Sequence, residues 1–395
     1  MARSSYNLTQ DVSDSSQGDM NSKVRVLAYR EKVPTPEIGY QNKLRLLYSR
    51  ASADKKVTLT PTRPLPSSPE RKLGAPDIKT DFYLNIIDWG KQGVLAVALN
   101  NVVYLWNSEN SRLSQLPVCR GTDYACSVSW LNQGGDILAV GTTANTVQLW
   151  DINRERITRL LDGHQNGVNC LDWNNHILSS GGKDSLVINH DVRCADHIAS
   201  IYHGHEQQVC GLAWSPDGRH LASGGNDNTL CVYDGNGSGN AEALFTLTDH
   251  LAAVRAVAWC PYQRNILASG GGSADRSIKL WNASTGTLLT SVDTGSQVCS
   301  LCWNPHEKEL LSAHGYMKNQ LCLWSYPNVS IVKEFYEHQG RVLDLALSPD
   351  GTVVCSAGAD EVLCLWRMFG SSRTGKKDIS SKEDDGLYSS FDQIR

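Results

Sequence analysis

The sequence lacks any apolar stretch long enough to cross a membrane. Its longest apolar run is close to "GVLAVAL", whereas a membrane-spanning helix needs about 20 consecutive apolar residues. The first residues, "MARSSYNLTQ", contain no apolar core of the kind found in a secretory signal. We therefore expect no membrane partner and a location in the cytoplasm and nucleus.

Paired cysteines and familiar catalytic motifs are also missing. The 12 cysteines are spread singly, which is typical of reduced thiols packed as small apolar side chains. Cys299 and Cys302 lie close together, but residues three apart on a strand point to opposite faces, so we interpret them as core thiols and not as zinc ligands. There is no phosphate-binding loop, nucleophile elbow or His-Glu-x-x-His sequence. We predict no enzyme, no metal and no cofactor.

Charge is distributed unevenly along the chain. Residues 1–73 carry 13 Lys and Arg against 7 Asp and Glu, whereas residues 74–369 carry 19 against 29. An acidic body argues against nucleic acid as a partner. It suits partners whose recognition motifs contain Lys or Arg.

The body of the chain, from Asp81 onward, is a repeat with steps of 40–48 residues. Short alternating strands such as "TVQLWD" and "SIKLWN" each end in an aromatic residue or a histidine. These residues are Trp106, Trp150, His190, Tyr233, Trp281, Trp324 and Trp366. A second series lies about 20 residues before the first: Trp89, Trp130, Trp173, Trp214, Trp259 and Trp303, with Leu347 in the seventh place.

Several short strands per unit, separated by Gly, Asp and Asn turns, match the WD-repeat β-propeller with four strands in each blade. We predict an all-β fold with a seven-bladed propeller over residues 73–369. A segment near Lys72–Ile78 is expected to add an outer strand that closes the last blade. Residues 1–72 are predicted to be a flexible arm with docking segments, and residues 370–395 a flexible tail.

Three Ser, His and Asp sets recur at matching repeat positions. They are His205, Ser223 and Asp227; His250, Ser269 and Asp275; and His338, Ser356 and Asp360. Such a set could suggest hydrolase chemistry. Because the same positions recur in three repeats, we favour a structural role in which each set satisfies buried polar groups.

Several longer motifs resemble the Fizzy family of anaphase-promoting complex co-activators, and its mitotic branch in particular. They include "GYQNKLRLLYS", "LGAPDIKTDFYLNIIDWG", "QVCGLAWSPDGRHLASGGNDN" and "SQVCSLCWNPHEKELLSAHGYMKNQL", together with the terminal Ile-Arg. The resemblance runs from about Arg25 to Phe369. It implies a non-enzymatic substrate receptor that binds degron motifs, anaphase-promoting complex subunits and spindle-checkpoint proteins.

The resemblance also implies two degron sites on the propeller. The site for Lys-Glu-Asn motifs corresponds to Asp81, Phe82, Asn226, Asn228, Ser273, Gln297 and Arg341. Asp81 suits the lysine, Arg341 the glutamate and the amides the asparagine; Asn226 and Asn228 could equally be turn residues. The destruction-box site corresponds to Leu73 and Glu361, but Gly74 stands where the family has a second acid. We therefore expect weakened destruction-box binding.

Further docking segments are implied in the arm and the tail. In the family, Ile394 and Arg395 would dock to a ligase scaffold subunit through an apolar slot and charge-assisted bonds. The match to the checkpoint Mad-binding motif comprises Arg25, Val26, Leu27, Tyr29 and Pro34. This segment could instead be an amphipathic strand against the propeller. Thr60 and Ser68 stand in Ser/Thr-Pro-x-Arg sequences and are candidates for phosphorylation.

One family element is not found in this sequence. The N-terminal activating motif, of the form Asp-Arg-Tyr-Ile-Pro-x-Arg, does not occur in the first 70 residues. We expect either a shortened N-terminus or a protein that docks without full activation. A ligase-docking scaffold or regulator therefore stays open beside the co-activator reading, and a propeller hydrolase is the third and least supported reading.

Overall fold

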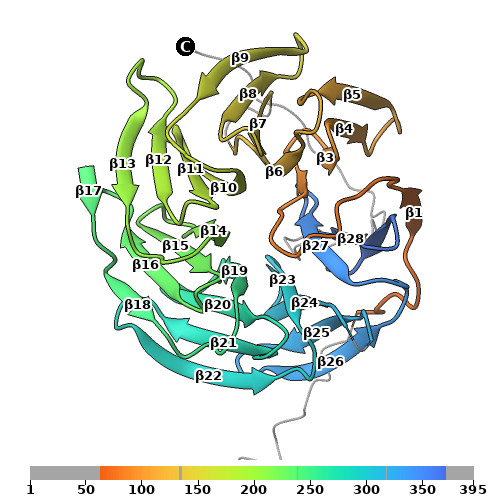
Figure 1. Cartoon of the computed structure of the whole chain (residues 1–395). Helices are drawn as coiled ribbons and strands as arrows, with labels where there is room; N and C mark the ends of the chain where they lie inside the picture. Colours follow the sequence, from red (N-terminus) through yellow and green to blue (C-terminus); the bar gives the residue numbers. More distant parts are fainter. Residues whose placement is uncertain (1–62, 133–135, 238, 317, 371–395) are drawn as a thin grey trace, which may run out of the picture. The chain divides into compact units, whose positions relative to one another are not determined.

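The computed structural model describes residues 63–132, 136–237, 239–316 and 318–370. Within these ranges every regular element is a β-strand, and the strands form seven sheets. Figure 1 shows the sheets as blades around a ring, with β14, β19 and β23 on the inside and β13, β22 and β26 on the outside. The predicted all-β, seven-bladed propeller is confirmed.

The first three blades follow one another along the chain and are antiparallel from the innermost strand outward. The first blade contains β2 (Ile87–Trp89), β3 (Val94–Leu99), β4 (Val102–Asn107) and β5 (Leu113–Pro117). The second contains β6 (Ala125–Trp130), β7 (Ile137–Thr142), β8 (Val147–Asp151) and β9 (Arg156–Leu161). The third contains β10 (Val168–Asn174), β11 (Ile177–Gly182), β12 (Val187–Asp191) and β13 (Ile198–Tyr202).

The next three blades have the same order, with one addition. The fourth contains β14 (Val209–Trp214), β15 (His220–Gly225), β16 (Leu230–Asp234) and β18 (Phe245–Leu247). The fifth contains β19 (Val254–Trp259), β20 (Ile266–Gly271), β21 (Ser277–Asn282) and β22 (Thr287–Asp293). The sixth contains β23 (Val298–Trp303), β24 (Glu309–His314), β25 (Leu321–Ser325) and β26 (Ser330–Phe335). The addition is β17 (Gly239–Ala241), which leaves the fourth blade and pairs in parallel with β13.

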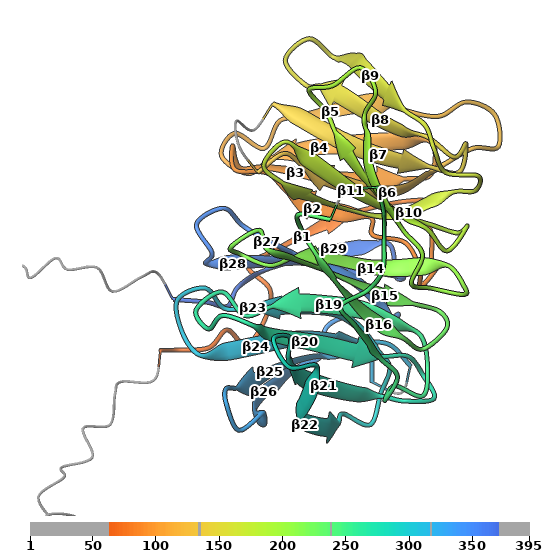
Figure 2. The same cartoon turned by 90° about the vertical axis from the view of Figure 1, so that its left-hand side faces the viewer.

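The last blade is closed by a strand from the beginning of the propeller, as predicted. It contains β27 (Val342–Leu347), β28 (Val353–Gly358) and β29 (Val362–Arg367), and its outer strand is β1 (Arg71–Gly74). In this pairing Leu73 lies opposite Leu363 and Gly74 opposite Val362; Figure 2 shows β1 beside β29. Because the two ends of the propeller share one sheet, the ring has no open edge between its first and last elements.

Residues that precede the first strand also contact the propeller. Its compact unit starts at Arg63, which forms ion pairs with Glu307 and Glu309 before the first strand begins. Lys333 Nζ donates to the carbonyl oxygen of Pro66 at 2.6 Å. These contacts connect Arg63 and Pro66 to the sixth blade, a feature that strand periodicity alone does not reveal.

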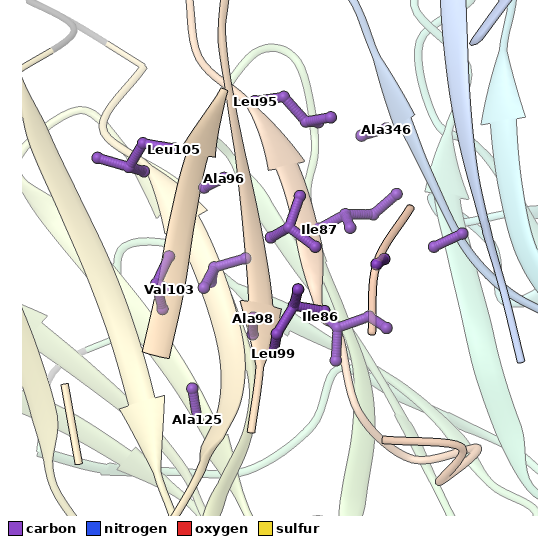
Figure 3. Packing of buried hydrophobic residues seen from close by; sticks show 14 of the residues in the cluster. Ile86, Ile87, Leu95, Ala96, Ala98, Leu99, Val103, Leu105, Ala125 and Ala346 are labelled. Carbon is purple, nitrogen blue, oxygen red and sulfur yellow. The ribbon is translucent and has the colours of Figure 1, made fainter. Parts of the chain in front are cut away.

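Apolar packing between neighbouring blades forms the core. The largest cluster joins the first blade to its neighbours on both sides, with Leu95, Val103 and Leu105 from the first blade and Ala346 from the last (Figure 3). The aromatic residues of both repeat series end the innermost and third strands, where most are buried. The periodic aromatics of the sequence are therefore core residues, as expected.

The Ser, His and Asp sets lie inside the blades. In the last blade, His338 Nδ1 lies 3.1 Å from Asp360 and His338 Nε2 lies 2.8 Å from Ser356 Oγ, which also accepts a bond from Trp366 Nε1 at 3.0 Å. Ser356 has no exposed surface. A serine that is buried and already hydrogen-bonded cannot reach a substrate, so the geometry supports the structural role.

The third blade holds a fourth set that the sequence analysis did not identify. Ser180 Oγ lies 2.8 Å from both His164 Nε2 and His190 Nε2, and His164 Nδ1 lies 3.0 Å from Asp184. Asp184 precedes His190 by six residues, the same step as in the other sets. That spacing was available in the sequence, but histidine in place of the final aromatic residue concealed it.

Six innermost strands carry a β-bulge at the same place. The ladder skips one residue in each: Cys126, Asn169, Cys210, Arg255, Cys299 and Leu343. A bulged residue leaves its backbone groups outside the ladder, and buried carbonyl groups need other donors. Asn85, which precedes the first blade, donates from its side chain to the carbonyl groups of Asn169 and Cys210 at 2.8 and 3.0 Å. The carbonyl groups of two bulge residues therefore hold Asn85, and with it the segment that leads into the first blade.

Candidate functional site

The predicted top-face residues come from two kinds of loop that lie at the same end of the propeller. Because adjacent strands are antiparallel, a turn between the second and third strands lies at the same end as the loop that enters the next innermost strand. Asn226, Asn228 and Ser273 lie in turns of the first kind, and Gln297 and Arg341 directly precede β23 and β27. We call this end the top face.

Five of the seven predicted residues line one top-face pocket of about 310 Å³. They are Phe82, Asn226, Asn228, Ser273 and Gln297. Gln297 is buried except for a small part of its surface, whereas Ser273 is exposed. The structure thus brings together residues from four separate parts of the sequence.

Arg341 and Asp81 lie next to this top-face pocket. Arg341 Nη1 is 3.4 Å from Gln297 Oε1, and Nη2 donates to the carbonyl oxygen of Thr80 at 2.8 Å. The Arg341 guanidinium also lies 6.0 Å from the centre of the Phe82 ring, and its Nε has no hydrogen-bond partner among the described residues. Asp81 Oδ1 accepts a bond from the backbone N–H of Tyr83 at 3.0 Å. A cation and a carboxylate therefore flank the amides.

Tyr83 is a pocket residue that the sequence analysis missed. Its hydroxyl donates to Asn226 Oδ1 at 2.7 Å, which fixes the orientation of that amide. Burial, with smaller contributions from Cys210 and Asp81, raises the pKa of Tyr83 above its ordinary value, so the hydroxyl keeps its proton and remains a donor. Its position directly after the predicted Phe82 could have indicated this role.

The same pocket includes further residues that were not predicted. Leu251, Ala252 and Ala253 precede β19 and line the pocket, as does Gly272. Leu251, Ala252 and Ala253 precede the innermost strand of the fifth blade, just as Gln297 and Arg341 precede the innermost strands of the sixth and seventh blades. Comparing the residues before each innermost strand would have found them.

Gly315 and Tyr316 support Arg341 from the neighbouring turn. The Arg341 guanidinium lies 5.0 Å from the centre of the Tyr316 ring, within the range of a cation–π contact. A Cβ atom on Gly315 would lie 2.6 Å from Arg341 Cδ and 3.0 Å from Gln297 Oε1. Because real Cβ atoms do not approach other atoms so closely, only glycine at position 315 leaves Arg341 where it is.

The predicted destruction-box residues also lie close together. Leu73 is half-buried in β1, and the N–H of Ala75 donates to the carbonyl oxygen of Glu361 at 2.8 Å. Glu361 is exposed in the turn before β29. The nearby pocket of about 720 Å³ between the first and last blades is lined by Arg71, Trp106 and Leu365 among others, but neither Leu73 nor Glu361 lines it.

Several predicted residues fall outside the described part of the chain. They are Arg25, Val26, Leu27, Tyr29, Pro34, Thr60, Ile394 and Arg395. Ser68 is described and is exposed ahead of β1, where a kinase could reach it.

Neither a metal site nor a membrane-spanning helix is found among the described residues. No group of three or more His, Cys, Asp or Glu side chains among them is placed to hold a metal ion. No helix in residues 63–132, 136–237, 239–316 and 318–370 has the length and apolar character required to span a bilayer. All 12 cysteines lie in the described part and are free thiols.

Comparisons with known proteins identify similar chains. The chain is 46% identical over 372 residues to "Anaphase-promoting complex subunit cdc20" of Dictyostelium discoideum, covering 92% of this chain and 73% of that protein. It is 47% identical to "Cell division cycle 20.1, cofactor of APC complex" of Arabidopsis thaliana, covering 89% of this chain and 77% of the relative. It is 43% identical to "Protein FIZZY-RELATED 3" of the same plant, covering 86% and 69%.

The fold is similar to a chain in the crystal structure of a mitotic checkpoint complex. The TM-score is 0.75 with 42% sequence identity, and the match covers 88% of this chain and all of the other. The family model of the CDC20/Fizzy WD40 domain matches residues 73–366. The chain described here is therefore a member of the CDC20/Fizzy family.

Proposed function

We propose that the chain is a substrate-recognition co-activator of the anaphase-promoting complex ubiquitin ligase. It binds degron motifs on the propeller and presents their proteins for ubiquitination in the cell cycle. Relatives named as a subunit or a cofactor of that complex support this proposal. The similarity to a chain of the mitotic checkpoint complex supports spindle-checkpoint proteins as further partners.

The observation that carries the proposal is the convergence of complementary groups at the top-face pocket. Asp81 and Arg341 supply a carboxylate and a guanidinium beside the pocket, and Asn226 and Asn228 supply two amides in its lining. A Lys-Glu-Asn segment presents an ammonium, a carboxylate and an amide, which match these groups one by one. A rigid propeller holds them in place without a further folding cost.

The chain itself performs no chemical step in this proposal. Each Ser–His–Asp set belongs to the blade interior, and Ser223, Ser269 and Ser356 have no exposed surface. Ubiquitin transfer is assigned to the ligase, and the propeller contributes binding and orientation.

A second function has one specific observation in its favour. The activating sequence Asp-Arg-Tyr-Ile-Pro-x-Arg does not occur in residues 1–70 of the given sequence, which keeps a docking regulator as the alternative to the co-activator. The co-activator and the docking regulator would use the same pocket. Ubiquitin transfer therefore distinguishes the two functions, whereas peptide binding does not.

Reconstituted ubiquitination separates the two functions. The purified ligase is supplied with a substrate that carries one Lys-Glu-Asn motif, with and without this protein. A co-activator increases ubiquitin transfer to the substrate, and substrate with a mutated motif serves as the control. Unchanged or reduced transfer, with peptide binding intact, would favour the regulator.

The docking segments belong to the same proposal. We propose that Ile394 and Arg395 bind a ligase scaffold subunit and that the segment containing Val26 and Leu27 binds the checkpoint Mad protein, in the cytoplasm or nucleus. Deleting residues 394–395 should weaken ligase recovery in a pull-down at equal thermal stability. Val26→Ala with Leu27→Ala should abolish Mad binding while substrate capture continues.

A further inference from the structure

The top-face pocket contains an apolar wall that a Lys-Glu-Asn motif does not use. Phe82, Leu251, Ala252 and Ala253 form this wall, whereas the remaining lining is largely polar. The polar residues of this lining suit the asparagine of the motif, while Asp81 and Arg341, beside the pocket, suit its lysine and glutamate. An apolar wall next to them implies that one more side chain is recognised.

Leu251 is the most exposed large apolar residue in the described part of the chain. The residue is 72% exposed and lies in the loop that leads into the innermost strand β19. A large apolar side chain held in water gains free energy when a ligand covers it. Exposed leucines are common on protein surfaces, so its position matters more than its exposure.

The loop around Leu251 is fixed on both sides. His250, directly before it, is buried and lies 2.6 Å from Ser269 Oγ through Nε2. After it, the carbonyl oxygen of Ala253 accepts a bond from the N–H of Gly272 at 2.9 Å. Leu251 is therefore presented at the pocket by a rigid loop, and binding does not have to order this segment.

The location of this wall indicates which residue of the bound peptide contacts Leu251. Leu251 lines the same pocket as Asn226, Asn228 and Ser273, the residues whose polar groups suit the asparagine of the motif. Arg341, which suits the glutamate, is not part of that lining. The residue beyond the asparagine is therefore the one that can reach Leu251.

We propose that the top-face pocket recognises a fourth residue, an apolar side chain directly after the Lys-Glu-Asn motif, through Leu251 and the neighbouring alanines. This inference rests on the proposed function, because it names the class of degron that the same site prefers. The preferred ligands are Lys-Glu-Asn segments followed by Leu, Ile, Val or Met. Segments followed by Ser or Asp bind more weakly.

The test uses two peptides that differ only after the asparagine, Lys-Glu-Asn-Leu and Lys-Glu-Asn-Ser in one common sequence. Each is titrated against the full chain by fluorescence anisotropy. We expect the leucine peptide to bind about three- to tenfold more tightly, as the burial of part of one leucine side chain implies. In Leu251→Gln both peptides should bind with equal affinity.

Leu289→Gln is the matched control, since Leu289 is 51% exposed on the outer strand β22, away from the pocket. It should keep the preference for the leucine peptide. Equal binding of both peptides to the unmodified chain, or a preference that persists in Leu251→Gln, would overturn the inference while leaving the proposed function intact. If neither peptide binds, both the site and the inference are wrong.

Discussion

The carboxylate of Asp344 lies 3.3 Å from the guanidinium of Arg255, and both side chains are buried in the innermost strands of the ring. Arg255 occupies one of the bulge positions and also donates to the carbonyl groups of Leu84 and Cys299. Leu84 follows Phe82 and Tyr83, which line the top-face pocket. Phe82 packs in turn against Ala253 and Cys299. Arg255 thus links Asp344 to the backbone of Leu84, the residue that directly follows Tyr83 of the pocket.

Arg255→Met should lower the free energy of unfolding by about 3–5 kcal/mol, because it leaves Asp344 as an uncompensated buried charge. Adding Asp344→Leu should restore part of that loss, since an apolar pair can replace a buried ion pair. Lys-Glu-Asn peptides should still bind weakly to the double variant, because the carbonyl of Leu84 has lost its donor. Chemical denaturation and peptide titration give the two quantities. Full recovery of affinity in the double variant would show that Arg255 does not position the pocket.

Gly74→Asp should strengthen binding of destruction-box peptides. A Cβ atom at position 74 meets no other atom within 4 Å, and Gly74 lies one ladder position from Glu361 through its pairing with Val362. A second exposed carboxylate near the degron arginine is worth about 1 kcal/mol or less, which is up to roughly fivefold in affinity. Isothermal titration of Gly74→Asp and Gly74→Asn measures the effect of the charge alone, and equal affinities would refute it.

Asp172 should make stability depend on pH in the neutral range. Its carboxylate accepts bonds from the N–H groups of Trp173 and Trp214 at 2.8 and 2.6 Å, yet burial outweighs them and raises its pKa to about 7. Since the folded pKa lies above the ordinary value of 3.8, the stabilising contribution is complete below pH 3.8 and is lost as pH rises through about 7.

Asp172→Asn should therefore be less stable than the unmodified chain at pH 5, with a deficit that shrinks toward pH 8. Urea unfolding at four pH values between 5 and 8 measures this. Asp217→Asn is the control, because the hydrogen bond from Ser215 lowers the pKa of Asp217 and its titration falls below this window. A constant deficit for Asp172→Asn would contradict the assignment.

Gly315→Ala should weaken recognition of the glutamate in a Lys-Glu-Asn peptide and leave recognition of the lysine unchanged. The new methyl group would displace Arg341, whose Cδ lies 2.6 Å from the position of the added Cβ. Peptides with Lys-Gln-Asn in place of Lys-Glu-Asn isolate this contribution. We expect the ratio of the two affinities to fall by about three- to tenfold, as for loss of one charge-assisted bond. An unchanged ratio would mean that Arg341 does not contact the glutamate.

The repeat made most of the fold predictable. The two aromatic series mark the ends of the innermost and third strands of the blades. Trp89 and Trp106 of the first blade, for example, belong to a core cluster that also contains residues of the neighbouring blades. The closing strand was also predicted, since a propeller needs its ends joined. Strand β17 was not, because its pairing with β13 depends on a loop from another blade.

The candidate site was predictable only where a family motif pointed to it. Phe82 and Gln297, which the family motif indicated, line the pocket; Leu251 was missed although it stands before an innermost strand as Gln297 does, and Arg255 carried no signal of its own. Leu251 matters because a loop places it beside amides from another blade, and Arg255 because a bulge directs it to the carbonyl of Leu84. Such long-range placement follows from the closed ring and is not contained in any local pattern.

The most direct test of the central claim is the affinity of a Lys-Glu-Asn peptide for Arg341→Glu. Reversing this charge places a carboxylate opposite the peptide's glutamate, so we expect binding to fall below detection while thermal stability and destruction-box binding persist. Arg219→Glu, on an exposed arginine in the loop between β14 and β15, is the control and should bind as the unmodified chain does. Unchanged affinity in Arg341→Glu would contradict the assignment of the top-face pocket as the degron site.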